Sequence, residues 1–162
     1  MPKENRWHEA VKQVLKEIGE DRGYDVEESE QEMIISKRFG MYDHEKREIH
    51  SLSYKPDVVW KKRHRYVAIF EIEYLNPKST SKLMEKRKYA IGSLMLGYVA
   101  TLHKSIDNLF FITNSEPLCA EMAKLLEFAD IKPAKKIAYY YEPLRTHSIL
   151  KKDLTIFITQ AI

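Results

Sequence analysis

The sequence predicts a mixed α/β protein in which helices flank a mixed β-sheet. Three observations lead to this prediction. Apolar residues recur every three or four positions through residues 3–22, which is the spacing of an amphipathic helix. A continuously apolar run at 66–70 is typical of a central strand covered on both faces. Helical and strand patterns then alternate toward the C-terminus, which favours one sheet with helices packed against it.

The first half of the chain is expected to hold one helix and three strands. The helix places Trp7, Val11 and Ile18 on one side and ends at Gly23, a residue favoured at helix C-termini. The polar segment up to about residue 51 shows neither a helix nor a strand pattern. The three strands are expected at residues 33–36, 55–60 and 66–74, the last two joined by a basic turn at 61–65.

The second half begins where Asn76 and Pro77 interrupt the strand pattern. Ser79, Thr80 or Ser81 can cap a helix that runs to about residue 103. Further elements are predicted as a strand at 108–113, a helix at 116–129, and strands at 136–141 and 154–159. The expected order is therefore an α-β-β-β-α-β core followed by a C-terminal helix and two strands.

Length and composition indicate one globular domain over residues 1–162. The chain has 162 residues, of which 44% are hydrophobic and 31% charged. This balance excludes a disordered or fibrous protein, and the length suits a single core. The sequence contains no internal repeat, flexible linker or low-complexity tract, so no domain boundary is predicted.

Several classes of protein are excluded by what the sequence lacks. The longest uncharged stretch, 90–102, is too short for a membrane-spanning helix, and the charged N-terminus does not resemble an export signal. A single cysteine, Cys119, excludes internal disulfides and multi-cysteine zinc sites. The five glycines are isolated, which argues against a phosphate-binding loop and a nucleotide cofactor. We therefore expect an intracellular, cytoplasmic protein without a membrane partner.

Positive charge is clustered although the net charge is small. The chain has 27 Lys and Arg against 24 Asp and Glu, a net charge of +3 at pH 7. Each cluster is interpreted either as a solvated surface or as a contact for a polyanion. The clustered residues are Lys61, Lys62, Arg63 and Arg65; Lys82, Lys86, Arg87 and Lys88; and Arg145, Lys151 and Lys152.

Three carboxylates are predicted to meet in the hairpin formed by 55–60 and 66–74. Asp57 stands near the start of the first strand, whereas Glu71 and Glu73 stand near the end of the second. A turn centred on residue 64 pairs position 57 with 71, and one centred on 65 pairs it with 73. Glu71 and Glu73 share one strand face because side chains alternate along a strand.

Carboxylates in an apolar strand are costly because buried anions lose hydration and repel one another. A hard cation such as Mg²⁺ or Mn²⁺ compensates this charge, since it prefers oxygen ligands, and it supports phosphodiester hydrolysis. The alternative is that Glu71 and Glu73 are solvated or pair with Lys or Arg.

Pro56-Asp57 followed by Glu71-Ile72-Glu73, in this order of elements, resembles the PD-(D/E)XK nuclease superfamily. The resemblance covers roughly residues 7–113. It implies a restriction-endonuclease-like fold in which Asp57 and Glu71 bind Mg²⁺ and Glu73 takes the position of the lysine.

The chain departs from the family pattern because it contains no E-x-K. Some restriction enzymes of the superfamily similarly carry E-x-E, with the second glutamate as base or metal ligand. Other members supply the positive charge from the next helix, where Lys82, Lys86 and Arg87 are available here. Lys86 and Tyr89 also look like a pair found in some plasmid replication-relaxation proteins.

The resemblance also implies an acidic metal ligand on the first helix. Aligning Gly23 with the glycine that ends this helix in archaeal Holliday-junction resolvases puts the ligand at Lys12, and aligning Gly19 puts it at His8. Glu9 is the nearest acid and is the candidate ligand, although an ordinary surface position is the competing interpretation.

The sequence thus predicts a Mg²⁺-dependent DNA endonuclease, restriction-like or junction-resolving. Asp57, Glu71 and Glu73 would form the centre, with Lys86 or Arg87 stabilising the negative charge that develops on the phosphate. The basic turn and residues 82–88 would contact DNA phosphates, and cutting two strands favours a homodimer. The alternative is a catalytically inactive DNA-binding or plasmid or viral replication-accessory protein of the same fold.

Overall fold

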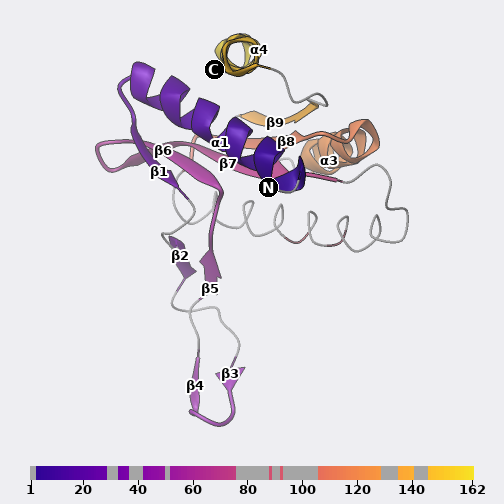
Figure 1. Ribbon diagram of the computed structural model, residues 1–162. Helices are drawn as coiled ribbons and strands as arrows, with labels where there is room; N and C mark the ends of the chain where they lie inside the picture. Colours follow the sequence, from indigo (N-terminus) through magenta and orange to yellow (C-terminus); the bar gives the residue numbers. More distant parts are fainter. Residues whose placement is uncertain are drawn as a thin grey trace.

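The structure, a computed structural model, describes residues 3–28, 33–36, 42–49, 52–75, 88, 92, 106–128, 135–140 and 146–162. These residues form a mixed α/β fold, a five-stranded sheet flanked by helices (Figure 1). The sheet, in spatial order, consists of β1 (Asp25–Glu28), β6 (Val58–Lys62), β7 (Arg65–Glu73), β8 (Asn108–Thr113) and β9 (Lys135–Tyr140). The helices are α1 (Lys3–Asp21), α3 (Glu116–Phe128) and α4 (His147–Ala161).

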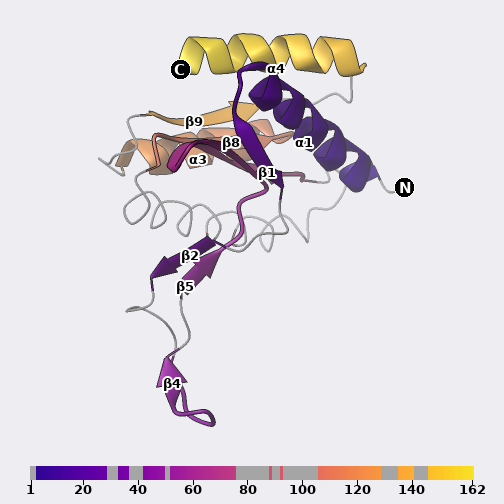
Figure 2. The ribbon, with the colours of Figure 1, turned by 90° about the vertical axis from the view of Figure 1, so that its left-hand side faces the viewer.

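The sheet is antiparallel on one side and parallel on the other. Strands β1, β6 and β7 pair antiparallel, whereas β7, β8 and β9 pair parallel. Helix α3 makes the connection between the parallel strands β8 and β9, as such crossovers require. Figure 2 shows α1 and α4 on one side of the sheet and α3 on the other. The predicted mixed sheet with flanking helices is confirmed.

Two short ribbons extend away from the sheet, in the direction of the bottom of Figures 1 and 2. One pairs β2 (Met33–Ser36) with β5 (Leu52–Tyr54), and the other pairs β3 (Tyr42–Asp43) with β4 (Glu48–Ile49). The predicted strand at 33–36 exists, but it lies in this ribbon. Strand β1 pairs with β6 in its place. Its polar sequence, DVEE, is suited to the edge of a sheet and lacks the apolar pattern of a covered strand, so no pattern in the sequence predicts it.

The predicted C-terminal strand at 154–159 is wrong, because these residues belong to helix α4. Their Ile, Phe and Thr content favours a strand locally. Leu150, Leu154, Ile158 and Ala161 nevertheless recur at helical spacing, and all four are buried on one face of α4. Burial of this apolar stripe against the body of the protein therefore outweighs the β propensity of residues 154–159.

The remaining predicted elements lie close to their observed bounds. Helix α1 and strand β8 are confirmed, as are β7, α3 and β9 to within one residue at their ends, whereas β6 begins three residues later and ends two residues later than the predicted 55–60. The helix expected up to residue 103 lies almost wholly outside the described residues, although Lys88 and Gly92 are helical. Within the described part of the chain, no helix is long and apolar enough to span a membrane.

Aromatic residues form the centre of the core between α1, α4 and the sheet. Trp60 is fully buried, and its ring centroid lies 4.6 Å from that of Phe70 and 5.6 Å from that of Tyr24. Phe70 stacks on Phe110 of the neighbouring strand at 5.0 Å. The indole Nε1 of Trp60 donates to the carbonyl oxygen of Leu15 at 3.0 Å, which ties β6 to α1.

The close approach of α1 to β6 requires a glycine. A Cβ atom at Gly19 would lie 2.5 Å from Nε1 of Trp60 and 2.7 Å from Cγ2 of Val26. Four residues after Gly19, Gly23 adopts a φ of 77°, and Tyr24 N donates to Gly19 O at 2.9 Å. Gly23 thus ends the helix as predicted, in the left-handed conformation that glycine permits.

Polar contacts join the exposed sides of α1 and α4. Glu17 accepts from Nε2 of His147 at 2.7 Å, and Asp21 pairs with Nζ of Lys151 at 2.9 Å. Burial alone would raise the pKa of Glu17, but hydrogen bonds from His147 and Gln13 and the nearby positive charges outweigh it and lower that pKa. The hydrogen bond to Asp21 raises the pKa of Lys151.

These contacts predict a loss of stability in acid. A carboxyl group whose pKa is lowered by folding contributes stability above its unfolded pKa, about 4.3 for Glu, and loses it as the pH falls through the folded value. The urea midpoint of the wild type should therefore fall more between pH 7 and pH 3 than that of Glu17→Gln. Equal acid-induced shifts in both proteins would show that Glu17 does not contribute to this dependence.

Candidate active site

The β6–β7 hairpin sets which residues face each other at the candidate site. Lys62 pairs with Arg65 across a two-residue turn, but Trp60 pairs with Ala68, so Val67 is an extra residue in β7. Without this bulge, position 57 would fall opposite Phe70. With it, Val58 pairs with Phe70, and position 57 falls opposite Glu71. The pairing at the site is thus the first of the two predicted registers.

The bulge is held in place by the start of β8. Asn108 is buried, and its Nδ2 donates to the carbonyl oxygen of Val67 at 2.8 Å. The backbone N–H of Asp107 donates to the carbonyl oxygen of Tyr66 at 3.1 Å. These two bonds satisfy carbonyl groups at the bulge, and they stabilise the register that brings Asp57 to Glu71.

Asp57 is fixed at the end of the sheet by both its backbone and its side chain. Its N–H donates to Phe70 O at 3.1 Å, and its Oδ2 accepts from the N–H of Ile72 at 2.8 Å. The carboxylate therefore extends the ladder between β6 and β7 by one bond. Oδ1 is turned toward α1, where it lies 3.4 Å from Nε2 of His8.

Helix α1 presents His8 to Asp57. The hydrogen bond to Asp57 raises the pKa of His8, although burial and the charge of Lys12 oppose this rise. Lys12 follows His8 by one helical turn, and its positive charge acts on His8. Glu9, the predicted helix ligand, is 61% exposed, and its Oε1 lies 3.9 Å from Nδ1 of His8. The structure places His8, rather than Glu9, against Asp57.

Glu71 and Glu73 lie on one face of β7, as predicted. Phe70 and Ile72 belong to the core cluster under α1 and α4, so the alternating positions 71 and 73 face the other side of the sheet. Glu71 is only 6% exposed and pairs in register with Phe111, whereas Glu73 is half-buried opposite Thr113. A carboxylate at so buried a position has lost most of its hydration.

The donor chemistry at this end of the hairpin fits a hard divalent cation. Mg²⁺ needs only one or two carboxylates, with water and phosphate oxygens as its other ligands, and Asp57 is hydrogen-bonded to the residues on either side of Glu71 in β7. Among the described residues, no three His, Cys, Asp or Glu side chains are grouped closely enough to hold a metal ion.

The basic turn lies at the far end of the hairpin from Asp57. The five residues of β6 separate the turn from Asp57, a length of roughly 16 Å at about 3.3 Å per residue. Lys61 Nζ is 2.6 Å from Glu27 Oε1, and Arg65 forms a two-point contact with Asp107 at 2.7 and 2.8 Å. Lys62 and Arg63 are exposed. Lys82, Lys86 and Arg87 lie outside the described residues.

Cys119 shows no sign of a reactive thiol. It is partly buried in α3, and burial together with the charge of Glu116 raises its pKa. The thiolate, which is the reactive form, is therefore disfavoured at neutral pH.

Comparison with known proteins gives no relative of this chain. No protein-family model, no curated protein and no solved structure matches it. The function is therefore argued from the site itself.

Proposed function

We propose that this protein is a Mg²⁺-dependent DNA endonuclease with a restriction-endonuclease-like fold. The observation that carries the proposal is that Asp57 is hydrogen-bonded to Phe70 and Ile72, the two chain neighbours of the buried Glu71 in β7. The bulge at Val67 acts at a distance, because it sets the register of the ladder from Trp60 to Val58 and so the position of Asp57 along β7. A buried anion facing a second anion needs a compensating positive charge.

Asp57 and Glu71 would hold the ion, and Glu73, further along the same strand face, would be a further ligand or the base that orients the attacking water. When bound, Mg²⁺ supplies Lewis acidity toward a phosphate oxygen. The bond from Ile72 N to Oδ2 fixes the Asp57 carboxylate before substrate arrives, so no ordering is needed during the reaction. Mn²⁺ would serve the same carboxylates.

His8 and Lys12 would supply positive charge that the E-x-E motif lacks. His8 already contacts Oδ1 of Asp57, and its raised pKa favours the protonated, cationic form. Such a group can stabilise charge on a phosphate or pass a proton to a leaving oxygen. Lys86 and Arg87 are retained as candidates for the same role from the segment that follows β7.

DNA is the proposed partner, and the protein would act as a homodimer if it cuts both strands of a duplex or two arms of a junction. A cleavage assay tests this function. Supercoiled plasmid, linear duplex and four-way junction are incubated with wild-type protein in Mg²⁺, in Mn²⁺ and in chelator. We expect cutting of at least one substrate in either metal and none in chelator. Intact DNA in every reaction, at protein concentrations that saturate binding, would refute the endonuclease.

The second candidate is a DNA-binding or replication-accessory protein that has lost cleavage. The observation that favours it is the His8–Asp57 contact, because an internal cation can neutralise Asp57 without a metal. This candidate predicts DNA binding that is equal in Mg²⁺ and in chelator, with no strand scission.

A further inference from the structure

A hollow lies at the turn end of the β6–β7 hairpin, away from the carboxylates. Its volume is about 1060 Å³, and it is lined mainly by side chains of the turn. Tyr24, whose ring stacks on Trp60, forms part of the wall, as does Asn108 at the start of β8. The ionisable side chains that line the hollow are those of Lys62, Arg63, His64, Arg65 and Asp107. We call it the turn hollow.

The turn hollow has an excess of positive charge. Arg65 and Asp107 neutralise each other through their two-point contact. Lys62 and Arg63 are both exposed, and in the part of the chain that the structure describes no acidic side chain pairs with either. Two cations without an acidic side-chain partner among the described residues therefore line a concave surface, where they attract an anion more strongly than on a convex one.

Arg63 occupies a backbone position that disfavours it. Its φ of 58° is in the left-handed region, where glycine, asparagine and aspartate are the usual hairpin residues. An arginine here is unfavourable for the turn itself, and it places a guanidinium beside the Lys62 ammonium. Two adjacent cations in a strained turn are an arrangement that a bound anion would stabilise.

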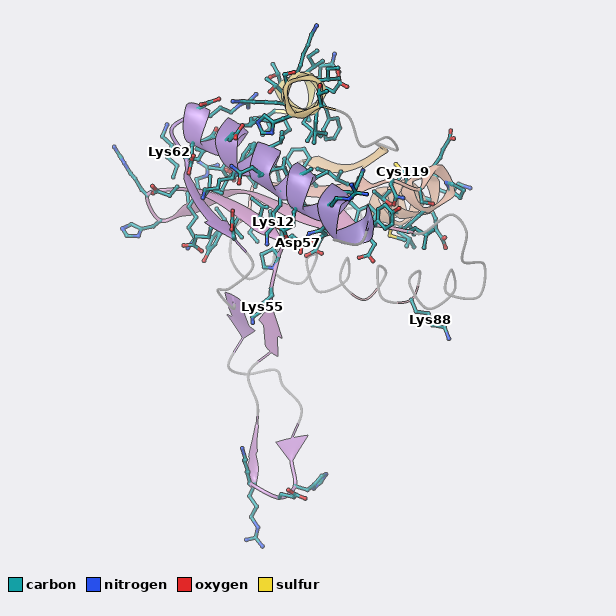
Figure 3. All side chains as sticks on the ribbon, viewed as in Figure 1. Lys12, Lys55, Asp57, Lys62, Lys88 and Cys119 are labelled. Carbon is teal, nitrogen blue, oxygen red and sulfur yellow. The ribbon has the colours of Figure 1, made fainter. Side chains whose placement is uncertain are left out.

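The turn hollow is separate from the carboxylate end. The five residues of β6 lie between them. Tyr24 and Val67, which line the hollow, pack against the core on the α1 and α4 side, whereas Glu71 faces the other side of the sheet. In Figure 3, Lys62 and Asp57 are correspondingly far apart along the hairpin. A ligand of the hollow does not depend on a metal at Asp57.

We propose that the turn hollow binds phosphate groups of a nucleic-acid strand, as a second contact separate from the carboxylate end and independent of divalent metal. The choice of nucleic acid among polyanions rests on the proposed function. Lys62 and Arg63 would contact phosphates, and Arg63 can do so with two parallel hydrogen bonds. Such contacts position a strand without reading its sequence, and they weaken as salt rises.

The test is the binding of a fluorescent single-stranded 12-mer and a 20-bp duplex in chelator, over a range of salt concentrations. The test variant combines Lys62→Gln with Arg63→Gly, and the matched control combines Lys46→Gln with Arg47→Gly, an exposed pair between β3 and β4 in which Arg47 has a φ of 53°. Both variants remove two positive charges. We expect the test variant to bind about tenfold more weakly and its salt slope to fall by about 1.5, since each lost phosphate contact contributes about 0.7 to 0.9. The control should match the wild type.

Folding is checked in the same samples. Arg63→Gly relieves the left-handed strain, so the test variant should melt no lower than the wild type. Equal weakening in both double variants would overturn the proposal in favour of general charge attraction, and unchanged binding in the test variant would overturn it outright. Cleavage at the carboxylate end is measured separately with Mg²⁺. A protein that does not cleave DNA can still show binding at the turn hollow in chelator, and a loss of that binding does not by itself refute cleavage.

Discussion

Asp57→Asn should abolish metal-dependent cleavage while leaving the fold intact. The amide oxygen of asparagine can still accept from Ile72 N, so the ladder bond at 2.8 Å is kept. The negative charge is lost, and with it the attraction for a divalent cation and for His8. We expect the cleavage rate to fall by about 10³-fold, the scale seen when one strong electrostatic group is removed from an active site. The measurement is single-turnover cleavage at saturating protein.

Asp25→Asn provides the matched control for this variant. Asp25 is exposed at the start of β1, where it is in register with Lys61 near the turn of the β6–β7 hairpin. The same chemical change there alters the net charge equally but leaves the Asp57 end of the hairpin untouched. Its cleavage rate should equal that of the wild type. If Asp57→Asn retained full activity while remaining folded, Asp57 would have no part in the chemistry.

Gly19→Ala should destabilise the protein strongly. The new Cβ would lie 2.5 Å from Nε1 of Trp60, which forces the indole to move and breaks its bond to Leu15 O. Overpacking costs about 1–3 kcal/mol and an unsatisfied buried donor about 1–3 kcal/mol, against about 1 kcal/mol gained in helix propensity. We expect a net loss of about 2 kcal/mol in the free energy of unfolding, measured by urea denaturation.

Gly92→Ala is the control with the opposite sign. Gly92 is helical and exposed, and a Cβ there would meet no atom within 4 Å. Replacing it should stabilise the protein by up to about 1 kcal/mol, because alanine is the better helix former. Equal effects of the two substitutions would mean that the contact between Gly19 and Trp60 does not limit the approach of α1 to the sheet.

Periodicity predicted those elements whose packing is simple. Helix α1 shows its buried stripe directly, and β8 is apolar at nearly every position because both of its faces are covered. Two predictions failed for opposite reasons. Residues 154–159 have strand-forming side chains that the helical stripe of α4 overrides, whereas β1 is a polar edge strand with no apolar signal.

The candidate site was predictable in part. The sequence placed Asp57 opposite Glu71 in one of two registers, and it placed Glu71 and Glu73 on one strand face. The bulge at Val67 that selects the register depends on Asn108, which lies 41 positions away in the chain, so local pattern carries no trace of it. The contact of His8 with Asp57 likewise depends on how α1 is rotated about its own axis. This rotation is set only when the buried residues of α1 pack against the sheet.

Calorimetric titration of Mg²⁺ and Mn²⁺ into the wild type and into Glu71→Gln tests the central claim most directly, because it needs no knowledge of the DNA substrate. Glu71 is 6% exposed, and the substitution keeps its shape while removing its charge. We predict saturable metal binding to the wild type and to the control Glu116→Gln, in which an exposed glutamate of α3 is changed in the same way. Binding should be lost in Glu71→Gln. No binding to the wild type, or equal binding to the wild type and Glu71→Gln, would contradict the account.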